Sequence, residues 1–178
     1  KFANDFCIVY NKAWASHEGN KQMNKEVALK MFKSMKAAID ERLVWFVYHN
    51  DDPIAFWLNL PELNQIFKNF HGKFGLLEKL KFLWVKKKGV NDKFTGIVFG
   101  VVPEFQGQGM DYYRSNEGGR EIQNKTNYKE LELQWQGDFN PKMINMSKNI
   151  GGHQSRTLAT YRYLFDRTKE FKRHPILN

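Results

Sequence analysis

Cysteine is almost absent from this chain of 178 residues, since Cys7 stands alone. A single cysteine excludes an internal disulfide and a cysteine-rich zinc site, so a reducing cytosol is the expected compartment. No apolar run approaches the ~20 residues that a membrane-spanning helix needs, and no signal-peptide pattern is present. The histidines at 17, 49, 71 and 153 lack the spacing of metal ligands, so no metal site is predicted.

Aromatic residues and positive charge are abundant. Fifteen Phe, seven Tyr and five Trp in a chain that is 42% hydrophobic argue against disorder and predict one globular domain over residues 1–178. The formal net charge of +9 permits an anionic partner, whether nucleic acid, a membrane surface or a phosphorylated cofactor, without choosing among them. Because the chain starts at Lys1 without a Met, we expect a domain excised from a longer protein.

Hydrophobic periodicity predicts an order of helices and strands. The predicted helices cover residues 2–14, 24–40, 61–70, 76–84, 110–124 and 141–150. The predicted strands cover 43–48, 54–60, 97–102, 128–136 and 157–165. A turn signal at 50–53 makes the first two strands an antiparallel hairpin, and the strands separated by one helix favour parallel crossovers. The expected fold class is therefore mixed α/β, with helices on both faces of a mixed sheet.

The stretch Gly96–Asp111, GIVFGVVPEFQGQGMD, is the most informative part of the chain. An apolar run that Pro103 ends is followed by Gln106-Gly107-Gln108-Gly109 and the start of a helix. Glycines allow close backbone approach, and the first N–H groups of a helix lack internal partners, so this arrangement can bind a phosphate. The same spacing also occurs where a tight turn merely needs positive φ.

A second apolar stripe, Leu76, Leu77, Leu80, Leu83 and Trp84, is followed by three lysines at 86–88. Such a segment could lie on a membrane surface or bind acyl chains. It could equally be a helix packed on the sheet, with lysines favoured near its C-terminus. The sequence leaves both interpretations open.

With this order of elements, the chain resembles the GCN5-related N-acetyltransferase (GNAT) superfamily over nearly its whole length. The family motif Arg/Gln-x-x-Gly-x-Gly/Ala opens a helix after the fourth strand. Gln106 and Gly109 match it, while Asp111 stands where Gly or Ala is usual. Asn140, Met143, Met146 and Gly151 resemble the helix that follows strand five. The segment Tyr10–Trp14 and the position of Asp111 resemble the C-terminal half of proteins with two GNAT-like halves in tandem.

The resemblance implies an acyl-CoA N-acyltransferase fold with a mostly antiparallel sheet, parallel splayed strands four and five, and the first family strand missing. It also implies acetyl-CoA or another acyl-CoA as co-substrate, lying between the splayed strands. The implied cofactor-binding residues are Val101, Val102, Gln106, Gly107, Gln108, Gly109, Met110, Asp111 and Asn140. An inward-pointing Asp111 would repel phosphate, whereas an outward-pointing one would stabilise the helix.

The family's usual catalytic pair does not match this sequence. The position of the general base, five residues before Asn140, holds Trp135, and that of the general acid, seven residues after it, holds Ser147. The remaining candidate catalytic residues are Glu132, Asp138 and Ser147, and each can equally be structural or solvated.

Three functions follow as alternatives. The first is an acyl-CoA-dependent N-acyltransferase acting on a small-molecule or peptide amine. The second is a catalytically silent GNAT-fold module that binds CoA or serves in interactions, for example by packing on an N-terminal GNAT-like half. The third is a basic module for nucleic acid or a membrane surface, disfavoured because the lysines are dispersed outside 79–88.

Overall fold

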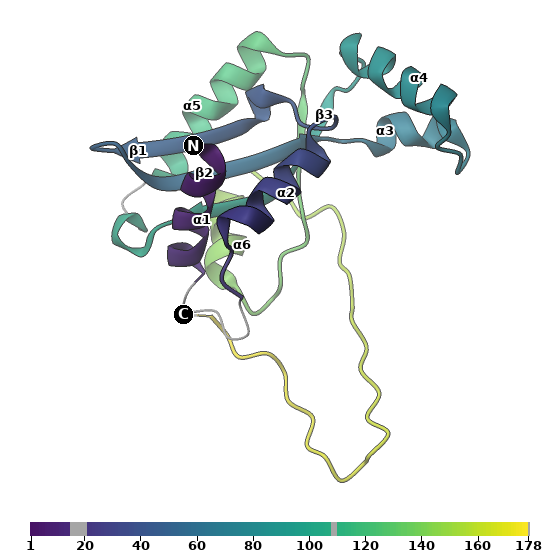
Figure 1. Cartoon of the computed structure of the whole chain (residues 1–178). Coiled ribbons are helices and arrows are strands. Elements are labelled where there is room, and N and C mark those ends of the chain that lie inside the picture. Colours follow the sequence, from purple (N-terminus) through teal and green to yellow (C-terminus); the bar gives the residue numbers. More distant parts are fainter. Residues whose placement is uncertain (15–20, 108–109, 178) are drawn as a thin grey trace. The chain divides into compact units, whose positions relative to one another are not determined.

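A mixed sheet of four strands organises residues 1–133 of the computed structural model (Figure 1). The strands lie in the spatial order β1 (Val44–His49), β2 (Asp52–Pro61), β3 (Lys93–Val101) and β4 (Glu130–Leu133). The first three pair antiparallel, and β3 pairs parallel with β4. The predicted hairpin and the predicted mixed, mostly antiparallel sheet are confirmed. β3 begins four residues earlier than expected, and β4 is shorter than the predicted strand.

The structure describes residues 1–14, 21–107 and 110–177, with the backbone alone for 110–117. It divides into two compact units, residues 1–133 and 134–178. Each unit is considered separately below. That the whole chain forms one domain stays a prediction.

Two helices cover one face of the sheet. α1 (Phe2–Ala13) buries Phe6 and Val9 against Phe56 and Leu58 of β2, with the rings of Phe6 and Phe56 4.8 Å apart. α2 (Lys25–Met35) adds Ala28, and Asn24 caps it as predicted, accepting a hydrogen bond from the Val27 N–H at 2.8 Å. Cys7 is buried in this cluster, and burial raises the pKa of its thiol. α2 ends at Met35, not near Asp40, because Asp40 instead begins the short 3₁₀ helix η1 (Glu41–Leu43).

The other face is covered by α5 (Met110–Lys125), which confirms the predicted helix and places helices on both faces. Ile122 of α5 packs with Leu43, Phe94 and Tyr128. Gly118 does not interrupt this helix. It lies buried beside the ring of Trp57, and an added Cβ would stand 3.5 Å from the nearest ring atom, an ordinary van der Waals contact.

β3 also contains a glycine that its neighbours require. A Cβ atom added at Gly100 would lie 3.1 Å from two ring atoms of Phe56 and 3.5 Å from the Cβ of Ala13. The C-terminal end of β3 therefore passes close to the Phe56 ring of β2 and to the end of α1.

A small helical layer follows β2. It consists of α3 (Asn64–Phe67), the 3₁₀ helix η2 (Lys68–Phe70) and α4 (Leu76–Lys87), which begins and ends close to the prediction. Its own core contains the buried side chains of Ile66, Phe70 and Phe82. The predicted break at Gly72 is confirmed, since Gly72 adopts φ +76° between η2 and α4.

The second unit contains α6 (Pro141–Asn149) and a long irregular segment. The strand predicted at 157–165 is wrong, because these residues have no strand conformation. The helix prediction is confirmed, with Pro141 at its first position and Gly151, at φ +86°, just after its end.

Candidate active site

The site predicted from sequence begins where β3 and β4 part. The two strands pair only from Lys93 with Glu130 to Gly96 with Leu133. β3 then continues to Val101, held on its other edge by β2 as far as Ala55. Within the sheet that the structure describes, the pairing of β3 with β4 therefore ends at Gly96. Parallel strands that pair for four residues and then separate leave backbone groups of β3 facing away from β2.

Val101 and Val102, two predicted cofactor-binding residues, lie at and just after the end of β3 and are both buried. The Val102 N–H donates to the Ile54 carbonyl of β2 at 2.9 Å, so its peptide group faces β2. The Val101 carbonyl faces the opposite edge, where it accepts a hydrogen bond from Gln106 Nε2 at 3.0 Å. Of the two residues, Val101 is the one whose backbone is directed toward the parting of the strands.

The predicted phosphate turn follows a 3₁₀ helix, η3 (Pro103–Phe105). Gln106 donates its backbone N–H to the Pro103 carbonyl at 3.2 Å, and Gly107 takes the left-handed conformation, φ +72°. Gln108 and Gly109 lie outside the described residues. Met110 and Asp111 form the first turn of α5 by their backbone, and their side chains lie outside the description. The orientation of Asp111, on which the sequence analysis left two alternatives, therefore remains a prediction.

Asn140, the last predicted cofactor-binding residue, belongs to the second unit. It is the N-cap of α6, and its Oδ1 accepts a hydrogen bond from the Met143 N–H at 3.1 Å. A capping asparagine stabilises the first turn of a helix, and this is the role its contacts show.

The three candidate catalytic residues each have structural partners. Glu132 on β4 forms an ion pair with Lys93 of the neighbouring strand, 3.0 Å from its Nζ. Asp138 pairs with Arg173 at an exposed position. The Ser147 hydroxyl donates to the Met143 carbonyl one turn earlier at 3.0 Å and accepts from Gln136 Nε2. Each of these contacts suits a structural role. The Glu132 carboxylate must also break its ion pair with Lys93 before it can accept a proton.

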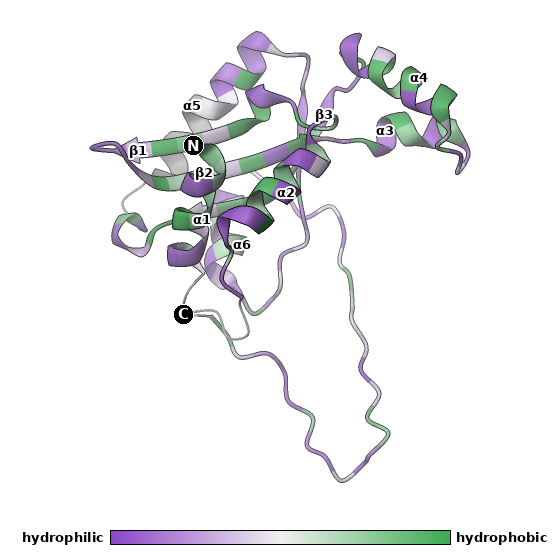
Figure 2. Cartoon of the chain, in the orientation of Figure 1, coloured by the Kyte–Doolittle hydropathy of each residue, from purple (hydrophilic) through white to green (hydrophobic). Residues whose placement is uncertain are grey.

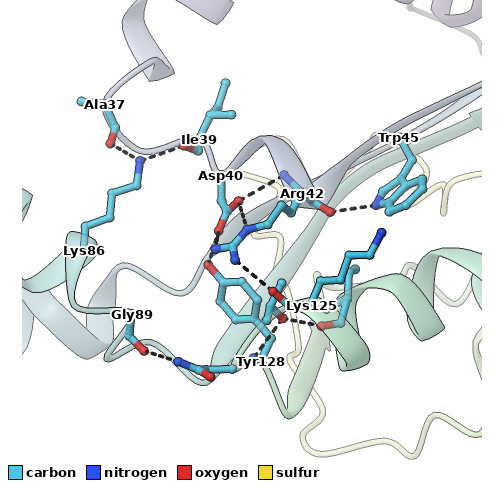
Figure 3. A network of polar contacts seen from close by, with 12 residues as sticks. Ala37, Ile39, Asp40, Arg42, Trp45, Lys86, Gly89, Lys125 and Tyr128 are labelled. Atoms are coloured by element: carbon cyan, nitrogen blue, oxygen red, sulfur yellow. Dashed lines mark hydrogen bonds and ion pairs between the residues drawn. The ribbon is translucent and has the colours of Figure 1, made fainter.

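A polar network that sequence reasoning missed lies at the other end of β4, near its N-terminus (Figure 3). Arg42 forms a bidentate ion pair with Asp40, with Nη2 and Oδ2 2.7 Å apart. Tyr128 donates its hydroxyl to the same carboxylate at 3.1 Å, and the Arg42 guanidinium also reaches the Lys125 carbonyl at 3.2 Å. The spacing Asp-x-Arg directly before a strand was the available signal.

The network perturbs its ionisable groups. Burial alone would raise the pKa of Asp40, but the hydrogen bonds and charge of Arg42 outweigh it, so that pKa is lowered. Burial, together with the Asp40 carboxylate, raises the pKa of Tyr128. Lys86 of α4 joins the same region by donating to the carbonyls of Ala37 and Ile39, each at 2.7 Å (Figure 3). These contacts connect three segments far apart in the sequence, residues 37–42, Lys86 and residues 125–128, which is a structural function.

The described residues contain neither a metal-binding cluster nor a membrane-spanning helix. Over residues 1–14, 21–107 and 110–177, no group of three or more His, Cys, Asp or Glu side chains could hold a metal ion. No helix in the same ranges has the length and apolar character needed to cross a bilayer.

The chain is similar in sequence to a bacterial ceramide synthase of Caulobacter vibrioides (strain NA1000 / CB15N). The two are 27% identical over 158 residues, which cover 86% of this chain and 41% of that protein. The chain thus spans about two fifths of the length of this relative. No family model matches the chain.

Solved acetyltransferases share the fold. The aminoglycoside N-acetyltransferase AAC(6')-Iy in complex with CoA superposes with a TM-score of 0.56 at 11% identity, over 90% of this chain and 88% of that one. A possible acetyltransferase from Clostridium difficile 630 gives 0.55 at 16% identity, over 91% of each chain. The ribosomal-protein-alanine N-acetyltransferase from Brucella melitensis biovar Abortus 2308 gives 0.54 at 10%, over 90% and 92%. The chain has the fold of the GNAT acyltransferases, as the resemblance implied.

Proposed function

We propose that this domain is an acyl-CoA-dependent N-acyltransferase. The parting of β3 from β4 after Gly96 carries the proposal, because the Val101 carbonyl lies on the edge of β3 that is directed away from β2, beyond the last pair with β4. A pantetheine arm contains two amides and can pair with such an edge as a short strand would. When the arm binds, one of its amide N–H groups takes the place of Gln106 Nε2 as the donor to the Val101 carbonyl.

The turn after β3 suits the diphosphate of CoA. No heavy atom of the described residues lies within 4 Å of where a Cβ of Gly107 would stand, so this point of the turn is open on that side. The helix that follows, α5, presents N–H groups of its first turn without intrahelical partners. We therefore propose the turn from Gly107 to Asp111 as the diphosphate site, with Gln108 and Gly109 included from the sequence motif.

In the proposed reaction, the nitrogen of a neutral amine attacks the thioester carbonyl. The C–N bond forms, the C–S bond breaks, the nitrogen loses a proton and the sulfur leaves as a thiolate that takes one up. Because Glu132 is held by Lys93, and the positions implied for the base and acid hold Trp135 and Ser147, we propose that positioning and water relays serve in place of a dedicated pair.

We propose a long-chain amino alcohol as the acceptor. A ceramide synthase joins an acyl chain to the amino group of such a base, and the similarity to the Caulobacter protein extends over 86% of this chain. The finer proposal thus rests on sequence similarity, whereas acyl transfer itself rests on the fold and on the parted strands.

A catalytically silent, CoA-binding module is the second candidate. Trp135 at the implied position of the base and the helix-bound hydroxyl of Ser147 favour it. Tryptophan has no basic group, and a serine hydroxyl that already bonds a backbone carbonyl is a poor proton donor for a thiolate.

Two measurements on the full chain separate the candidates. Calorimetry with CoA and acyl-CoA tests binding, and DTNB detection of released thiol tests transfer to short polar amines, a peptide N-terminus and a long-chain amino alcohol. Release with the long-chain base, with the amide confirmed by mass spectrometry, is expected. Release with short amines alone refutes the acceptor, binding without release selects the silent module, and no binding at millimolar CoA rejects both.

A further inference from the structure

The α4 helix carries an outward apolar surface that is largely exposed in the part of the chain that the structure describes. Its buried side faces the core of the small helical layer, where Phe82 packs against Ile66 and Phe70. On the other side, five large apolar side chains are each more than half exposed: Leu76, Leu77, Leu80, Leu83 and Trp84. Phe74, just before the helix, is also about half exposed. Apolar residues recur along α4 in the hydropathy colouring of Figure 2.

These five side chains form one continuous surface, the α4 apolar face. At ~100° per residue they fall within an arc of about 120° around the helix axis. A patch of this kind on a described surface marks an interaction site more often than an isolated exposed leucine does. The packing of Phe82 on the opposite side fixes which way the patch is directed.

Lysines border the α4 apolar face on both sides. On the same helical wheel, Lys79 lies beyond one edge of the arc, while Lys81 and Lys88 lie beyond the other. The Lys88 ammonium stands 3.8 Å from the ring centroid of Trp84. The one acidic residue of α4, Glu78, is taken up by the N–H of Gly75 at the start of the helix.

Two lysines at the C-terminal end of α4 point in different directions. Lys86 is directed into the protein, where it bonds the Ala37 and Ile39 carbonyls, so α4 is fixed to the rest of its unit. Lys87 falls within the arc at the last turn, where a long side chain can reach past the apolar surface to a polar layer. The face is therefore rigidly supported, apolar at its centre and cationic at its borders.

We infer that the α4 apolar face binds the surface of a lipid bilayer that contains anionic lipids. Leucines and a tryptophan between lysines are the composition that lies at the boundary of headgroups and acyl chains, with the ammonium groups at the level of lipid phosphates. A hollow of about 280 Å³ beside the helix start is lined in part by Lys73, Lys81 and His71, together with Glu78. A second copy of the chain would lack the required negative charge on this face, since the same lysines would oppose one another.

Vesicle flotation of the full chain tests the inference. Binding is expected to vesicles of phosphatidylcholine with about 30% phosphatidylglycerol and to weaken steeply with salt and on pure phosphatidylcholine, because each lysine near an anionic surface contributes roughly fivefold. The double variant Leu80→Ser/Leu83→Ser removes apolar contact and should lower partition by roughly tenfold for each leucine. The triple variant Lys79→Gln/Lys81→Gln/Lys88→Gln should lower it about a hundredfold.

A matched charge control lies on α2, where three lysines are also exposed. The variant Lys25→Gln/Lys30→Gln/Lys33→Gln loses the same net charge, and its binding should change little. Circular dichroism verifies that each variant is folded. Absence of binding by the parent chain, or an equal loss in the α2 control, overturns the inference. So does a parent dimer that light scattering shows to dissociate in the leucine variant, since a second copy would then cover the face.

Membrane binding is independent of the proposed chemistry. Flotation involves no acyl transfer, so a silent domain can still bind vesicles and an active one can fail to. If both hold, α4 brings the domain to the layer in which amphiphilic acyl donors and long-chain amines reside.

Discussion

Replacing Gly107 with valine tests the proposed diphosphate turn most directly. Gly107 adopts φ +72°, and among the described residues no heavy atom lies within 4 Å of its missing Cβ, so valine meets no steric clash with any of them. The whole penalty is conformational, about 1–2 kcal/mol for a non-glycine residue in the left-handed region and more for a β-branched one. The substituted turn relieves this strain by moving away from that conformation.

Two quantities should respond. The melting temperature measured by circular dichroism should fall by several degrees, at roughly 2–4 °C per kcal/mol for a chain of this size. The Kd for CoA measured by calorimetry should rise about tenfold or more, because displaced N–H groups no longer converge on the diphosphate. Gly107→Asn should lie between the parent and valine, since asparagine tolerates this conformation better.

Gly72 supplies the matched control. It adopts φ +76°, and no heavy atom lies within 4 Å of its missing Cβ either. Gly72→Val should therefore lower the melting temperature by a similar amount and leave CoA affinity within about twofold. Parent-like CoA affinity in Gly107→Val, or an equal loss of affinity in Gly72→Val, would refute the assignment of the turn.

Three further predictions concern stability. Tyr48 donates to the Asp5 carboxylate at 2.7 Å, and burial followed by that carboxylate raises the pKa of Tyr48 to about 12. Its neutral form is therefore stabilised in the folded chain, so its contribution is complete below pH ~10 and lost as pH rises toward 12, and Tyr48→Phe should flatten alkaline unfolding in this window. Asp40 has the opposite pH dependence because its pKa is lowered, so its charged form stabilises the folded chain and Asp40→Asn should destabilise it at neutral pH. The difference in stability from the parent should shrink as pH falls below the ordinary pKa of ~3.9 and be lost below the lowered pKa of the folded chain. Gly100→Val overpacks the Phe56 ring and should cost about 1–3 kcal/mol in urea unfolding, with partial recovery in Gly100→Val/Phe56→Leu; a parent-like midpoint for the single variant would contradict the close contact.

Hydrophobic periodicity was sufficient to predict those helices and strands that have a clear pattern in the sequence and a neighbouring element to pack on. The hairpin followed from β-branched and aromatic runs around a turn, and it pairs from Val44 with Leu58 to His49 with Asp52. The helix after the glycine turn was predicted despite Gly118, although only the structure reveals that this glycine is buried beside Trp57. The parting of β3 and β4 came from the family resemblance, since no local pattern specifies where two strands separate.

The predicted strand at 157–165 failed for a physical reason. Its propensity came from Leu158, Tyr161, Tyr163 and Phe165, and all four are largely exposed. Strand propensity reflects packing on a neighbouring strand, and the described part of residues 134–177 has no strand at all to supply that partner. The Asp40–Arg42–Tyr128 network escaped notice for a related reason, since it joins residues that lie 88 positions apart in the chain.

The burial of Cys7 bears on how every acyl-transfer experiment is read. The chain has one thiol, and it lies 7% exposed in the α1 cluster with its ionisation suppressed by burial. A thiolate, not a protonated thiol, attacks the disulfide of DTNB, so the folded chain should react only slowly with the reagent that detects released CoA. A slow yellow background in a variant would then indicate that α1 has detached from β2. Each DTNB assay therefore also reports whether the variant is folded.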